Sequence, residues 1–173
     1  IPTEFEKTNN LNDYLYFDLD KTPQEQEAIY KQFRDMAEVV CTEDEYLAGK
    51  TDIQGPEFGF DEVVDVEGMP FKKALRITCT SVPEKSASFI SKTSATPKGG
   101  VSKTDRMLFA FRMRTVSGGD ENGVGKVQVQ IQHPETYQKA VFEIAVSGKD
   151  WTVIYMPFRG IENATDMGIR AGF

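Results

Sequence analysis

The sequence has few of the residues that most often perform catalysis or bind metals. Among its 173 residues there is one histidine, His133, and there are two cysteines, Cys41 and Cys79. These three residues fit no zinc-site spacing, and the cysteines leave open one disulfide or two separate thiols. Nucleophile-elbow, P-loop, zinc-protease and dinucleotide glycine motifs are also missing. We therefore expect no catalytic activity from this chain itself.

The sequence also lacks a long apolar run and an excess of positive charge. No apolar stretch approaches the roughly 18 residues of a membrane span. Lysine and arginine number 20 against 27 acidic residues, which gives a net charge of −7. Nucleic acids and anionic membranes need a basic face, so we expect neither as a partner. The length suits one domain of ordinary size with an extension.

Residues 1–50 are expected to form an N-terminal extension that contains a helix at about 22–40. Thr22 is a candidate N-cap, Pro23 suits the first helical position and Glu25 completes a capping box. Apolar residues then recur at helical spacing and form one stripe. An amphipathic helix of this kind must pack on the following domain or on another partner.

From about residue 56 the apolar period changes to two, which is typical of strands. Turn-rich segments such as TPKGGVSKTD and VSGGDENGVG separate the alternating stretches. Many short strands at this spacing predict an antiparallel β-sandwich over residues 51–173. The expected strands are 58–68, 72–81, 106–116, 125–134, 139–147, 151–158 and 167–173.

The segment KVQVQIQ (126–132) alternates apolar and amide side chains, so its three glutamines are expected on the outer face. The same alternation in 106–116 puts bulky residues inside and arginines outside. Amides and guanidinium groups offer several hydrogen bonds in fixed directions and suit sugar hydroxyls. A solvated face without a ligand is the alternative. The residues expected to share one outer surface are Arg76, Thr78, Arg112, Arg114, Gln128, Gln130 and Gln132.

The order of several motifs resembles the galactose-binding-like jelly rolls of carbohydrate-binding modules in families 4, 16 and 22. The motifs are VEGMPFKKALRIT, MLFAFRMRT, KVQVQIQ, GKDWTVIYMPF and ATDMGIRAGF, within residues 56–173. The resemblance implies a noncatalytic module that targets a polysaccharide-degrading enzyme to plant or algal glycan. It also implies a secreted, periplasmic or cell-surface location and a structural calcium ion, for which acidic residues near 57–67 single out no site.

In such modules a sugar lies across the concave face of one sheet, which here implies the seven polar residues above. Tyr137 is the best loop aromatic for stacking and Tyr155 a weaker one, whereas Trp151 and Phe158 resemble core residues. The sequence departs from the family in having no aromatic on the proposed outer face. The modules usually continue into one more closing strand, which an adjacent domain or a second fragment of the polypeptide would supply.

Two other functions remain open at this stage. The chain could be a structural or interaction sandwich that packs on a neighbouring catalytic domain. It could also be a polysaccharide lyase or hydrolase, although no acidic pair stands out among the 27 carboxylates.

Overall fold

The computed structural model describes residues 22, 24, 25, 28, 31, 35, 39–94, 98 and 101–171. Helix α4 (Glu43–Ala48) precedes the strands, and the 3₁₀ turn η2 (Ser86–Ser88) interrupts them. The strands are β1 (Gly59–Asp65), β2 (Lys73–Cys79), β3 (Ile90–Ser94), β4 (Arg106–Met113), β5 (Gly125–Gln132), β6 (Lys139–Ser147), β7 (Thr152–Arg159) and β8 (Asp166–Ala171).

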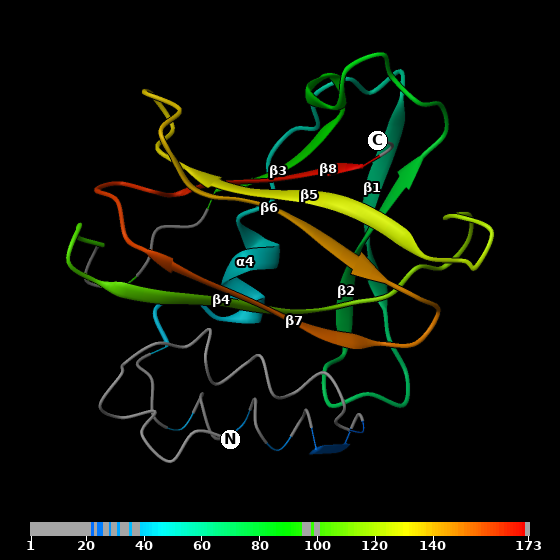
Figure 1. Cartoon of the computed structure of the whole chain (residues 1–173), viewed down its shortest axis with the longest axis horizontal. Helices are drawn as coiled ribbons and strands as arrows, with labels where there is room; N and C mark the ends of the chain where they lie inside the picture. The colour runs from blue at the N-terminus through cyan, green and yellow to red at the C-terminus, as the bar shows by residue number, and fades with distance from the viewer. Residues whose placement is uncertain are drawn as a thin grey trace.

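The strands form three antiparallel groups. A four-stranded sheet has the order β3-β8-β5-β6, while β4 pairs with β7 and β1 pairs with β2. The four-stranded sheet lies on one side of the core and the β4–β7 pair on the other, with β1 and β2 running steeply across one end (Figure 1). The mainly β, antiparallel architecture expected from the alternating sequence is confirmed.

The core lies between the four-stranded sheet and the β4–β7 pair. Val129 and Ile131 of β5 face it, as the alternation predicts, and both are buried. Phe109 and Phe111 of β4 face it from the opposite side, with ring centroids 4.9 Å apart. Burying these apolar faces is the main favourable contribution to folding, because it removes their area from water.

Strand β3 was not predicted, because its core-facing side chains are polar. Ser91 and Thr93 are both almost fully buried. The Ser91 hydroxyl donates to the Asp61 carboxylate at 2.6 Å, and that carboxylate also pairs with Lys50 at 3.0 Å. Thr93 bonds the buried hydroxyl of Tyr46, whose pKa is raised mainly by desolvation. Buried polar groups are tolerated when they are hydrogen-bonded, so this strand lacks an apolar signal.

Helix α4 was also not predicted, although it has a complete capping box. The Thr42 side chain accepts from the backbone of Glu45, and the Glu45 side chain accepts from the backbone of Thr42. The same reciprocal bonds join Thr22 and Glu25, as the sequence suggests. Most of the helix expected at 22–40 lies outside the described residues.

Three further features of the fold bear on expectations from the sequence. Cys41 and Cys79 are free thiols. Strand β8 pairs on both sides, with β3 and with β5, and is therefore an inner strand of its sheet. Within the described residues, no helix has the length and apolar character needed to cross a membrane.

Replacing Ile131 by alanine should lower the free energy of unfolding by about 2–5 kcal/mol, because it opens a cavity in the packed core. Val82 is exposed and provides the control, since Val82→Ala should change the free energy of unfolding by less than about 0.5 kcal/mol. Urea denaturation followed by circular dichroism measures both. Equal stability of the two variants would contradict the assignment of Ile131 to the core.

Candidate binding face

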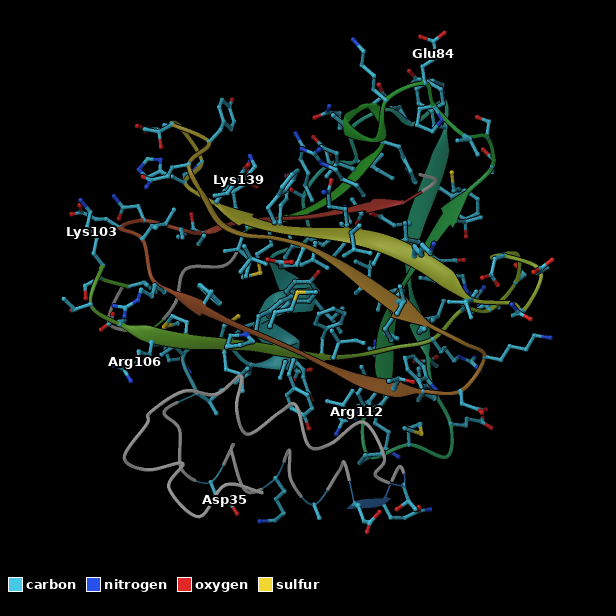
Figure 2. All side chains as sticks on the ribbon, in the orientation of Figure 1. Asp35, Glu84, Lys103, Arg106, Arg112 and Lys139 are labelled. Atoms are coloured by element: carbon cyan, nitrogen blue, oxygen red, sulfur yellow. The ribbon has the colours of Figure 1, made fainter. Side chains whose placement is uncertain are left out.

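The expected polar surface is divided among three sheets, so the prediction that its arginines and glutamines share one face is wrong. Arg76 and Thr78 lie on β2, and Arg112 lies on β4 with Arg114 directly after it. The glutamines lie on β5, in the four-stranded sheet. Figure 2 shows Lys139 beside the four-stranded sheet and Arg112 on the far side of the β4–β7 pair. The chain crosses between layers after β4, so β4 pairs with β7 instead of β5.

The arginines away from the glutamines have local partners. Arg112 lies over the ring of Phe71, at 5.1 Å from its centroid, and is 3.7 Å from a carboxylate oxygen of Glu43. Arg114 lies over the Trp151 ring at 5.1 Å. These cation–π contacts hold the guanidinium groups against aromatic side chains of the loops before β2 and β7.

Arg76 on β2 pairs with Glu62 of the neighbouring strand at 3.3 Å. Thr78 is on the same strand, opposite Phe60 of β1. Tyr155 lies on β7 opposite Ala110, which also places it outside the four-stranded sheet. None of these residues belongs to the surface formed around the glutamines.

The glutamines are less exposed than the alternation suggests. Gln130 is 3% exposed and Gln132 is 5% exposed, while Gln128 is half-buried. They do lie on the side of β5 opposite the core, next to β8 and β6. They are buried because long side chains from the two neighbouring strands lie over them.

The three glutamines and the residues around them form one surface, which we call the glutamine face. Two of the surrounding residues, Gly168 and Asp166, contribute to its shape. Gly168 of β8 is the register partner of Gln130, and Gln132 donates through Nε2 to the Asp166 carboxylate at 2.6 Å. The members of the glutamine face are Gln128, Gln130 and Gln132 of β5, Lys139, Phe142 and Ile144 of β6, and Asp166, Gly168 and Arg170 of β8.

A β-bulge brings Lys139 onto this face. The β5–β6 register pairs Ile131 with Val141 but Gln132 with Lys139, which skips Ala140. Regular pairing would put Ala140 opposite Gln132. Because the bulge re-aims one side chain, the Lys139 ammonium reaches the Gln132 side-chain oxygen and the Tyr137 carbonyl.

Phe142 is the aromatic member of the face and remains 46% exposed. The Arg170 guanidinium lies 5.3 Å from its ring centroid and the Lys139 ammonium 5.9 Å. Arg170 is paired with Gln128, whereas Phe142 is the partner of Gln130. The Arg170 side chain therefore crosses β5 between Gln128 and Gln130, and it donates to the Gln128 oxygen at 3.4 Å.

Two buried polar atoms on the face have no hydrogen-bond partner in the described structure. They are the side-chain oxygen Oε1 of Gln130 and the Nε–H of Arg170. One is an acceptor and the other a donor, on neighbouring strands of the same sheet. A buried polar atom without a partner destabilises the protein by about 1–3 kcal/mol, so such a pair favours a ligand group that both donates and accepts.

The electrostatics of the face are dominated by its cations. Burial lowers the pKa of Lys139, and the nearby Arg170 lowers it further, while Asp166 acts in the opposite direction. Burial also lowers the pKa of Arg170. Each cation is thus less stable in its charged form here than in water.

Tyr137 lies at the Lys139 end of the face and is exposed, with a left-handed backbone φ of 59°. Its carbonyl oxygen accepts from the Lys139 ammonium. The described residues contain no group of three or more His, Cys, Asp or Glu that could hold a metal ion. The structure therefore gives the expected calcium ion no location.

Sequence reasoning missed six members of the face, namely Lys139, Phe142, Ile144, Asp166, Gly168 and Arg170. The alternation in KAVFEIAVS does put Phe142 and Ile144 on one side of the strand, but only the pairing of β6 with β5 puts that side next to the glutamines. Lys139 could not be found by alternation, because the bulge reverses its direction.

Comparison with known proteins shows distant likenesses among solved structures. No family model matches the chain, and no curated protein matches it. One similar solved structure is described as "CBM4 structure and function". It is 9% identical, the match covers 69% of this chain and 74% of that one, and the TM-score is 0.46. A likeness this distant identifies no equivalent residues.

Gly168→Ala should disturb the glutamine face, because an added Cβ would lie 2.7 Å from Nε2 of Gln130 and 2.9 Å from Cγ2 of Ile90. We expect a loss of about 1–3 kcal/mol in the free energy of unfolding. Gly148→Ala is the matched control, since nothing lies within 4 Å of its added Cβ. Chemical denaturation of the two variants should separate them clearly. If Gly168→Ala is as stable as Gly148→Ala, Gln130 does not pack over Gly168.

Proposed function

We propose that this chain is a noncatalytic carbohydrate-binding module and that it binds a glycan on the glutamine face. The observation that supports this most directly is that the Gln130 side-chain oxygen and the Arg170 Nε–H, on neighbouring strands, both lack a hydrogen-bond partner. A sugar hydroxyl can donate to an amide oxygen and can accept from a guanidinium N–H. The amides of Gln128 and Gln132 lie on the same strand and bond Arg170, Asp166 and Lys139.

The aromatic member of the face suits the apolar side of a sugar ring. Phe142 is half-exposed and lies opposite Gln130 on the adjacent strand. Ligand sites typically combine apolar or aromatic surface with a few placed polar groups. Here both kinds of group stand on paired strands, which hold them more precisely than loops would.

We place the module in the setting that the sequence resemblance implies. It would be secreted or surface-located and would direct a polysaccharide-degrading enzyme to plant or algal glycan.

A structural or interaction domain is the second candidate, and one observation favours it. Strand β6 is an outer strand of its sheet, and it exposes Phe142, Ile144 and Val146 on one side. An exposed apolar strip of this kind is typical of protein contacts. A protein partner would contact the apolar strip of Phe142, Ile144 and Val146. It would not need the unpartnered Gln130 oxygen and Arg170 Nε–H, which glycan binding would use.

Phe142→Ala should lower the affinity for a bound glycan at least about tenfold, equivalent to about 1.4 kcal/mol. Phe60→Ala is the matched control, because Phe60 is 48% exposed but lies on β1 in another sheet. Affinity electrophoresis and calorimetry with xylan, β-glucan, mannan and polygalacturonate measure the effect. If the folded protein binds none of these glycans, or if Phe60→Ala weakens binding as much as Phe142→Ala, the proposal fails.

Gln130→Ala alone should also lower the affinity for the same glycan about tenfold, since it removes the buried hydrogen-bond acceptor. Its stability should be measured in parallel by denaturation, because the substitution also leaves a small void. A variant that stays folded and binds glycan at full strength would show that the Gln130 amide does not contact the ligand.

A further inference from the structure

The glutamine face and its extension onto neighbouring residues have a charge opposite to that of the whole chain. The strand register adds Lys126, opposite Val146, and Lys92, opposite Gly168, to the same side of the sheet as Lys139 and Arg170. The register places a single carboxylate, Asp166, on this side of the described strands. This concentration of cations stands out in a protein with a net charge of −7.

The cations at the centre of the face are not neutralised by carboxylates. No described carboxylate forms an ion pair with Lys139 or Arg170, and Asp166 accepts its hydrogen bond from Gln132 instead. Both cations contact the ring of Phe142, so they are held close to one another. Like charges held close together are stabilised by an anion that binds near both of them.

The shapes of the Arg170 guanidinium and the Lys139 ammonium favour one kind of anion. A guanidinium group matches a planar carboxylate through two parallel hydrogen bonds, and an ammonium group adds a compact charge. Both groups contact the exposed ring of Phe142, and the amides lie on the adjacent strand. A pyranose ring that carries a carboxylate would meet all three features in one residue.

We propose that the glycan recognised by this face is acidic, and that Lys139 and Arg170 bind the carboxylate of a uronic acid residue while Phe142 contacts its ring. This inference rests on the proposed function, since it specifies the class of sugar that the glutamine face takes. It does not extend to nucleic acids, because the chain as a whole has a net charge of −7.

Matched glycans test the role of the carboxylate. Oligogalacturonate and its fully methyl-esterified form share one backbone and differ in whether each carboxylate is charged or carries a methyl ester. We expect esterification to weaken binding to the unaltered chain at least tenfold in calorimetry. Lys139→Gln should remove most of that preference, while Lys73→Gln, an exposed cation on β2, should leave it unchanged.

Arg170→Lys tests the planar fork without removing charge. It should weaken oligogalacturonate binding several-fold and leave binding to any neutral glycan less affected. Because Arg170 bonds Gln128, the fold of this variant should be checked by its denaturation midpoint. Lys139 is exposed, so Lys139→Gln keeps the proposal testable if Arg170→Lys does not fold.

The outcomes separate the two proposals. Equal binding of the acidic and esterified forms would overturn the acidic-glycan inference but support glycan binding itself. Equal binding of poly-L-glutamate would also overturn it, because a bare polyanion would then suffice. Binding to none of the glycans, neutral or acidic, by the folded chain would overturn the proposed function. An acidic preference lost in Lys139→Gln and retained in Lys73→Gln supports both.

Discussion

Strand β5 lies between β8 and β6, so each of its side chains meets either the core or the glutamine face. Val129 and Ile131 pack inward, while the glutamines between them face outward. A slip of one residue in this strand would exchange the two sets and place amides in the core. Stability and the composition of the candidate site therefore depend on the same register, which the apolar residues fix.

The pairing partners of β5 complete the face in different ways. From β8 comes Gly168, whose lack of a side chain leaves space for the Gln130 amide, and Arg170, whose length lets it cross β5 to reach Phe142. From β6 comes the aromatic ring, and the bulge at Ile131/Gln132 adds Lys139. The result is a layer of buried amides beneath partly exposed cations and one ring.

Much of the sandwich could be predicted from alternation, and most of the face could not. Strands with apolar inner sides, such as β4 and β5, show their direction in the sequence. Strand β3 does not, because Ser91 and Thr93 are buried through hydrogen bonds to Asp61 and Tyr46. Alternation also cannot say which strands pair, and the arginines of 106–116 were therefore assigned to the wrong sheet. The bulge that turns Lys139 onto the glutamine face depends on local twist of the strands. The alternation of apolar and polar residues does not indicate that twist.

The position of β6 has a consequence for how the protein behaves at high concentration. This strand carries exposed Phe142, Ile144 and Val146, and it borders its sheet. An apolar edge strand can pair with the same strand of another molecule. The surface that suits a ligand can therefore also promote aggregation. Lys139 and Glu143 are charged residues on the same strand that oppose such self-association. Solubility thus sets a limit on how apolar this strand can become.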